Sequence, residues 1–133
     1  MKKEKTCKIV FSDIDGTLLT SDGQITEGTK EMILNLEKKG IPFILTSARS
    51  PEGVRVIKRM LGNHAPIIAF CGGLILDNDG NEIYSKMIPL KRALELKAML
   101  DKDFPAVACN TFGGEKWIVD DRDDWREQRE EKI

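Results

Sequence analysis

Two aspartates placed one residue apart are the first feature of the sequence that suggests chemistry. Asp13 and Asp15 stand in FSDIDGTLL, directly after a short apolar run and just before Gly16. Side chains alternate along a strand, so both carboxylates can face one side while Ile14 turns back into the protein. Paired carboxylates suit a hard cation such as Mg²⁺, an aspartate can accept a phosphoryl group, and Gly16 lets the backbone approach an anion closely. Taken alone, this pattern is also that of an ordinary polar turn.

A second polar group follows the next apolar run, in FILTSARS at residues 43–50. The hydroxyls of Thr46 and Ser47 can donate hydrogen bonds to a phosphate oxygen, and Arg49 can add a charge-assisted contact. The alternative is that Ser50 is a helix cap and the others are ordinary surface residues. Ligands of parallel sheets bind at the carboxyl ends of the strands, where both groups would lie, and this coincidence favours a phosphate site.

The elements that must position these groups alternate between strands and helices. Apolar, β-branched runs bounded by turn residues predict strands at 7–12, 41–50 and 65–73, and amphipathic stretches with helix caps predict helices at 25–40 and 50–62. This order predicts an α/β protein with a Rossmann-like parallel sheet and flanking helices. The pattern then changes to a hairpin around 78–81, a helix at 90–102 and a further hairpin, which predicts a first domain at 1–80 and a second at 81–133.

Composition excludes several classes of function. The 133 residues include 21 basic and 22 acidic side chains, so no excess charge favours nucleic acid or an acidic membrane surface. The three cysteines are widely spaced and there is one histidine, which is typical of reduced thiols and not of a zinc site. Neither a secretory leader nor a membrane-spanning run is evident. We therefore expect a cytoplasmic protein with neither nucleic-acid nor membrane partners.

Longer stretches resemble a known family. DIDGTLL resembles the first motif of the haloacid dehalogenase (HAD) superfamily, and TSAR lies where its second motif, a Ser or Thr after an apolar strand, is expected. DGTLLTSDGQIT, SARSPEGV and GGLILDNDGNEIY are together similar to the Cof-type branch of sugar-phosphate and related metabolite phosphatases, over essentially the whole chain. The resemblance implies Mg²⁺-dependent hydrolysis of a small phosphorylated metabolite through an aspartyl-phosphate intermediate.

The same resemblance implies a role for each candidate site residue. Asp13 would be the nucleophile and a magnesium ligand, and Asp15 the general acid and then base, with its backbone carbonyl on the metal. Ser47 and the amides around Gly16 would hold the phosphoryl group, with Arg49 assisting. The sequence departs from the family pattern at Ala48, where glycine is usual, and at residues 71–73, where CGG replaces the usual NG.

Parts of the family pattern are missing from the sequence. Members of this branch run to roughly twice this length, and their later lysine motif and GDGxND-like motif have no counterpart here. The acidic run 120–124 is better interpreted as solvated charge than as a metal site. We therefore expect an N-terminal half, with a partial HAD core at 1–80 and the first portion of an α+β cap at 81–133. The first strand would then be an exposed apolar edge, able to pair with a second copy in a homodimer, to bind a complementary fragment or to aggregate.

Two alternatives to a working phosphatase remain at this point. One is a catalytically incomplete chain that binds phosphate or metal, or only associates with itself. The other is a receiver-type phosphoacceptor domain, which would need an aspartate at the end of the third strand, where the sequence has Cys71 and two glycines.

Overall fold

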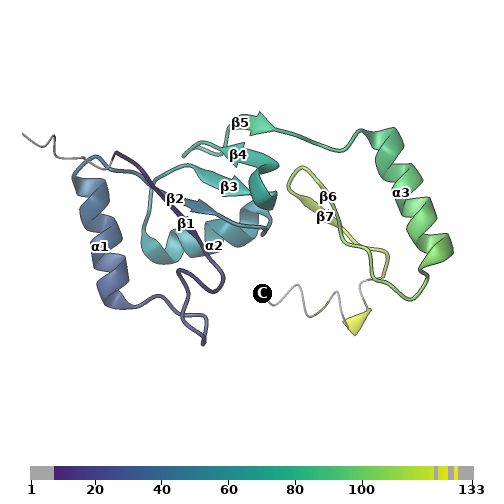
Figure 1. Ribbon diagram of the computed structural model, residues 1–133, viewed down its shortest axis with the longest axis horizontal. Coiled ribbons are helices and arrows are strands. Elements are labelled where there is room, and N and C mark those ends of the chain that lie inside the picture. Colours follow the sequence, from purple (N-terminus) through teal and green to yellow (C-terminus); the bar gives the residue numbers. More distant parts are fainter. Residues whose placement is uncertain (1–7, 122, 126–127, 129–133) are drawn as a thin grey trace, which may run out of the picture. The chain divides into compact units, whose positions relative to one another are not determined.

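The computed structural model describes residues 8–121, 123–125 and 128. Its contacts divide the chain into two compact units, Met1–Ser85 and Lys86–Ile133, which are described separately below (Figure 1). The identification of these parts as a partial core and the start of a cap, with a boundary after residue 80, stays a prediction. Within the described residues, no helix is both long enough and apolar enough to cross a membrane.

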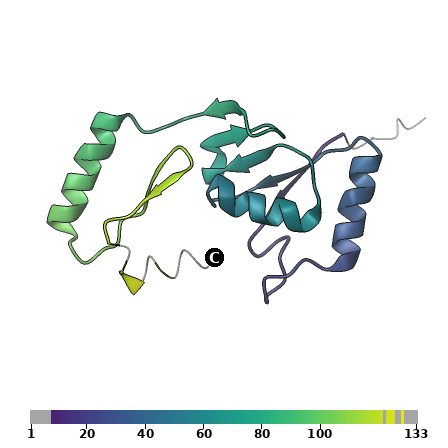
Figure 2. The same ribbon diagram turned by 180° about the vertical axis from the view of Figure 1, so that it is seen from behind.

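The first unit is built on one five-stranded sheet with the order β1-β2-β3-β4-β5, visible from both sides in Figures 1 and 2. Strands β1, β2 and β3 are parallel, and β4 and β5 continue the sheet as an antiparallel hairpin. The α/β class predicted from the sequence is confirmed, with a mixed sheet in place of a purely parallel one. The elements are β1 (Val10–Asp13), α1 (Glu27–Lys38), β2 (Phe43–Thr46), α2 (Pro51–Leu61), β3 (Ile67–Ala69), the short 3₁₀ turn η1 (Phe70–Gly72), β4 (Leu74–Leu76) and β5 (Glu82–Ser85).

The two helices of this unit begin at the caps that the sequence predicts. The hydroxyl of Thr26 accepts the amide three residues further along in α1, and Ser50 does the same for α2. Each bond satisfies a backbone donor that the first turn of a helix leaves without an intrahelical partner. Gly62 then ends α2 in the left-handed conformation, at φ 69°.

The core of the first unit lies between the sheet and its helices. Strand β2 is buried along most of its length, and Leu45 is 1% exposed. Helix α2 contributes one face of apolar side chains, and the turn after β1 contributes Ile14, which is fully buried. The core cluster comprises Ile14, Ile33, Phe43, Leu45, Val54, Ile57, Leu61, Ile67, Ala69, Leu74 and Leu76.

One buried polar side chain joins two strands of the core. Asn63 donates from Nδ2 to the Phe43 carbonyl at 2.7 Å and accepts the Ala65 amide at Oδ1 at 2.6 Å. It therefore satisfies backbone groups at the start of β2 and just before β3, in a place where unpaired groups would be costly.

Strand β1 lies at one end of the sheet order and is paired, within the described residues, with β2 alone. Phe11 is 55% exposed and Ile9 42% exposed. The strand as described begins at Val10, and Cys7, where the sequence predicts its start, lies outside the described residues. The exposed apolar edge that the sequence predicts is present.

The second unit contains helix α3 (Leu90–Asp103) and a hairpin of β6 (Thr111–Gly113) and β7 (Lys116–Ile118). The rings of Phe112 and Trp117 stack across the hairpin with centroids 6.4 Å apart. None of the described residues of this unit is classed as buried, and Leu94 in α3 is 62% exposed. The acidic run is largely exposed where described, and Asp120 forms an ion pair with Lys97. Much of the rest of the C-terminal segment lies outside the described residues.

Candidate active site

The carboxyl ends of β1 and β2 meet at one edge of the sheet. Asp13, the last residue of β1, lies opposite Thr46, the last residue of β2. The turn carrying Asp15 and the loop carrying Ser47 and Arg49 therefore leave the sheet side by side, as the parallel arrangement predicts. We use "candidate site" for Asp13, Asp15, Gly16, Ser47 and Arg49.

The turn after β1 wraps around a buried carbonyl. Ile14 accepts the amides of Thr17, Leu18 and Leu19 at 3.4, 3.0 and 3.1 Å, while its own side chain is enclosed in the core. Asp13 and Asp15, on either side of it, are exposed. This arrangement explains how a strand end can direct two carboxylates outward while staying firmly attached to the core.

Gly16 stands at the outer corner of that turn. Its φ is 75°, a conformation that a side chain would disfavour, and no atom lies within 4 Å of the position that a Cβ would take. The space in front of this backbone is therefore open to a ligand.

Ser47 is the most enclosed member of the candidate site, at 5% exposed. Its amide donates to the Ile68 carbonyl at 3.0 Å, its carbonyl accepts the Cys71 amide at 2.9 Å, and its Oγ accepts the Arg49 amide at 3.2 Å. Since Oγ already accepts a bond, the hydroxyl proton is the part that can be offered to a ligand oxygen. The donor role that the sequence suggests is consistent with this geometry.

Arg49 and Asp15 form a two-pronged ion pair. Nε of Arg49 donates to Oδ2 of Asp15 at 2.9 Å, and Nη2 donates to Oδ1 at 2.7 Å. The hydrogen bond from the guanidinium holds the pKa of Asp15 below its ordinary value and raises that of Arg49. In this state Asp15 is favoured as a carboxylate, which can accept a proton but cannot donate one. Sequence reasoning missed this pair, since the two residues are 34 positions apart.

A strained turn secures the loop that carries Ser47 and Arg49. Phe70 and Cys71 have φ values of 50° and 54°, which non-glycine residues rarely adopt, and Gly72 follows at 92°. The Phe70 amide donates to the Arg49 carbonyl at 3.0 Å, and the Cys71 amide to the Ser47 carbonyl. The CGG departure noted in the sequence therefore belongs to the structural support of the candidate site.

Comparison with known proteins identifies the family. Residues 10–133 match the family model of haloacid dehalogenase-like hydrolases. The chain belongs to the HAD-like hydrolase family. A Haemophilus influenzae protein named "Putative phosphatase" is 36% identical over 124 residues, covering 86% of this chain and 47% of that protein. A protein of Thermoplasma volcanium named "Phosphoglycolate phosphatase" is 38% identical over 74 residues, covering 56% of this chain and 33% of that protein.

Solved structures agree on the HAD-like fold. A haloacid dehalogenase-like hydrolase from Bacteroides thetaiotaomicron superposes with a TM-score of 0.82 at 21% identity, over 96% of this chain and 50% of that one. The chain thus spans about half the length of the relatives that it matches. Membership of this family sets aside the receiver-type alternative.

A metal site can be considered from the donors that the HAD-like chain provides. Asp13 is exposed, and the Asp15 carboxylate is held by Arg49. Across the part of the chain that the structure describes, no group of three or more His, Cys, Asp or Glu side chains is arranged to hold a metal ion. The Asp13 carboxylate and the Asp15 backbone carbonyl are oxygen ligands of the kind that Mg²⁺ prefers, and so fit such an ion in type but form only part of its shell.

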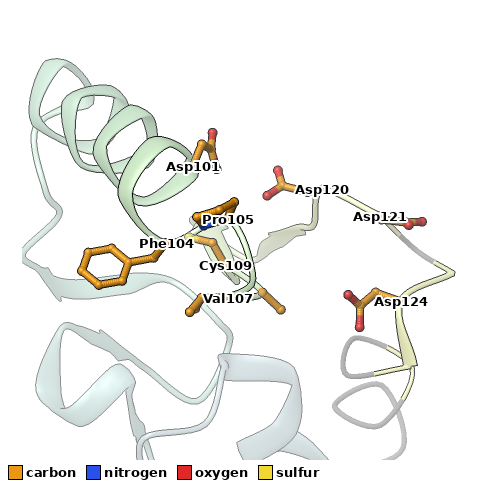
Figure 3. A pocket seen from close by; sticks show the side chains of 9 residues that line it. Asp101, Phe104, Pro105, Val107, Cys109, Asp120, Asp121 and Asp124 are labelled. Carbon is orange, nitrogen blue, oxygen red and sulfur yellow. The ribbon is translucent and has the colours of Figure 1, made fainter.

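A separate pocket of about 230 Å³ lies within the second unit (Figure 3). Its carboxylates do not converge: Asp101 and Asp120 are both bound by Lys97, and Asp121 points away from the other labelled side chains. The chemistry suggested by the sequence is therefore concentrated in the first unit. The pocket is lined by Asp101, Phe104, Pro105, Val107, Ala108, Cys109, Asp120, Asp121 and Asp124.

Proposed function

We propose that this chain carries the nucleophile and part of the phosphate-binding site of a Mg²⁺-dependent phosphatase of the Cof-type branch. The substrate class is a small phosphorylated metabolite such as a sugar phosphate. The observation that carries the proposal is the meeting of β1 and β2, with Asp13 opposite Thr46, so that the turn with Asp15 and the loop with the buried Ser47 begin at one edge of the sheet. Family membership and the phosphatase names of the relatives support it.

The chemistry follows from what each side chain offers. A carboxylate oxygen of Asp13 forms a bond to phosphorus as the ester P–O bond breaks, which leaves an aspartyl phosphate and an alcohol. Once it has left the Arg49 ion pair and taken up a proton, Asp15 gives that proton to the leaving oxygen and then takes one from the water that releases inorganic phosphate. The Ser47 hydroxyl donates to a phosphoryl oxygen, and the open backbone at Gly16 lets that group approach.

Magnesium would be held by the Asp13 carboxylate and the Asp15 carbonyl. When bound, it would neutralise negative charge on the phosphoryl oxygens and on Asp13, which otherwise repel each other. The chain's own contribution is to hold Asp13 at a strand end fixed to the core through Ile14.

An assay of the whole chain tests this proposal. Release of phosphate from an aryl phosphate should require Mg²⁺ and should fall by about a thousandfold or more in Asp13→Asn, because the amide cannot act as nucleophile. Asp22→Asn is the matched control, since Asp22 is an exposed aspartate that accepts a hydrogen bond from Thr20, outside the candidate site. A wild type with no turnover above Asp13→Asn would show that this chain is not a working phosphatase.

A second candidate function is self-association without turnover, alone or with phosphate bound. The specific observation is the position of β1 at the end of the sheet, with Phe11 more than half exposed. Unpaired strand edges readily accept another strand. Sedimentation velocity at micromolar concentration should show a homodimer that Phe11→Lys converts to monomer, and a monomeric wild type would contradict this candidate.

A further inference from the structure

The backbone of Arg49 is held on both sides by hydrogen bonds. Its amide donates to Ser47 Oγ, and its carbonyl accepts the Phe70 amide. A Cβ placed on Gly53 would stand 3.2 Å from the Arg49 Cβ and 3.5 Å from its Cδ, so the stem of this side chain lies against the first turn of α2 at a position where glycine leaves room for it. With the backbone held, the guanidinium is the part of Arg49 that can change partner.

Asp15, which the Arg49 guanidinium holds in this structure, is the more exposed member of the ion pair and can be displaced more easily than Arg49. The Asp15 side chain is 55% exposed, whereas that of Arg49 is 17% exposed. Solvent weakens an ion pair whose carboxylate is exposed in this way. A phosphate group presents the same fork of two oxygens with more negative charge, and Arg binds it with the same two donors.

We propose that Arg49 exchanges partners when a phosphoryl group enters the candidate site. In the free chain Nε and Nη2 of Arg49 hold Asp15, and in the occupied site they hold phosphoryl oxygens. Asp15 is then released and can turn to the leaving-group oxygen. Arg49 is thus a positioning residue for Asp15 as well as a phosphate ligand. This inference rests on the proposed function, because it requires phosphate to bind beside Ser47.

A cycle of variants tests the exchange in the full chain with inorganic phosphate as the probe. Phosphate affinity is measured by ³¹P NMR titration for the wild type, Asp15→Asn, Arg49→Met and the double variant, each first compared by circular dichroism and thermal unfolding. Asp15→Asn should bind phosphate about three- to fivefold more tightly, because Arg49 no longer has to leave an exposed ion pair. In the Arg49→Met background the same change should give no gain.

Simple charge repulsion predicts a different pattern. If Asp15 only repels phosphate, Asp15→Asn would raise the phosphate affinity of Arg49→Met at least as much as that of the wild type. That result would overturn the exchange. An Asp15→Asn variant that binds phosphate no better than the wild type would do the same, while leaving the proposed function standing. Absence of phosphate binding in every variant would overturn both.

A direct signal in the wild type needs no substitution. The Nε–H of Arg49 donates to Asp15 in the free chain and should change its ¹H–¹⁵N resonance as phosphate is added, with the same midpoint as the ³¹P titration. Arg49→Lys, which keeps the charge without the fork, identifies the resonance by its loss. An Nε–H signal that does not change while phosphate binds would overturn the exchange.

Discussion

The first compact unit encloses its apolar side chains, whereas the second leaves most of its own in contact with solvent. Leu45 in β2 and Leu61 in α2 are essentially inaccessible, while Leu90 and Leu94 in α3 are 75% and 62% exposed. Burial of apolar surface is the main favourable term in folding. Within the described residues, the first unit therefore has the larger share of this stabilisation.

This difference explains where the candidate site lies. Its residues sit on short loops attached to buried parts of the first unit, with Asp15 next to Ile14 and Ser47 following β2. A loop can hold reactive groups in accurate positions if a rigid scaffold anchors both of its ends. The second unit offers a pocket with several carboxylates but, in its described part, no buried side chain to fix them.

The largest expected effect comes from truncating matched leucines in the two units. Leu45→Ala removes a side chain that is 1% exposed and should lower the free energy of unfolding by about 3 kcal/mol. Leu94→Ala should change it by about 0.5 kcal/mol or less, because that side chain is mostly exposed already. Urea unfolding followed by circular dichroism measures both.

Tryptophan fluorescence separates the two units in this experiment. Both tryptophans, Trp117 and Trp125, belong to the second unit. The Leu45→Ala loss should therefore be larger in the circular dichroism transition than in the fluorescence transition. Equal losses for Leu45→Ala and Leu94→Ala would show that the contrast between the units is wrong.

The sequence predicts most of the first unit because its signals are local. Thr26 and Ser50 cap helices through contacts three residues away, and the alternation of strands and helices places Asp13 and Ser47 at one sheet edge. Helix α3 is also predicted by its periodicity. Its exposure is not, because burial depends on a partner element that periodicity cannot supply.

Contacts between distant residues are the part that the sequence does not predict. The Arg49 and Asp15 pair depends on the rotamers of two side chains in different loops. Asn63 follows a helix-ending glycine, and nothing in its neighbourhood indicates that it bonds to β2. The left-handed conformation of Cys71 is only weakly indicated in the sequence, by the two glycines that follow this residue.

An intermediate effect is expected where the first unit holds strain. Cys71 is exposed and has a φ of 54°, so Cys71→Gly should relieve backbone strain and raise the free energy of unfolding by about 0.5–1 kcal/mol. In the second unit, Gly114 has a φ of 63°, and Gly114→Ala should destabilise its hairpin by a similar amount. Thermal unfolding measures both, and a less stable Cys71→Gly would mean that the thiol makes contacts worth more than the strain.

The smallest effect concerns the ion pairs of the two units, which should respond to opposite ends of the pH scale. Because Arg49 lowers the pKa of Asp15, the folded chain binds that proton less readily than the unfolded chain. The pair's stabilisation is then complete above the ordinary value of 3.8 and is lost as the pH falls through the lower folded pKa. Solvent exposure of the Asp15 carboxylate limits the contribution to about 1 kcal/mol or less.

In the second unit, Asp101 and Asp120 raise the pKa of Lys97, so the contribution of its ammonium group is present at neutral pH and is lost in strong alkali. The measurement is the free energy of unfolding of the wild type minus that of Asp15→Asn, followed from neutral to acid pH, and the same difference for Lys97→Met, followed from neutral to alkaline pH, is the comparison. For Asp15→Asn this difference should shrink toward zero below pH 3.8, the ordinary value for an aspartate. A difference that stays constant into strong acid would show that the Arg49 contact does not stabilise the ionised form of Asp15. The expected difference in pH response between the two ion pairs would then be wrong.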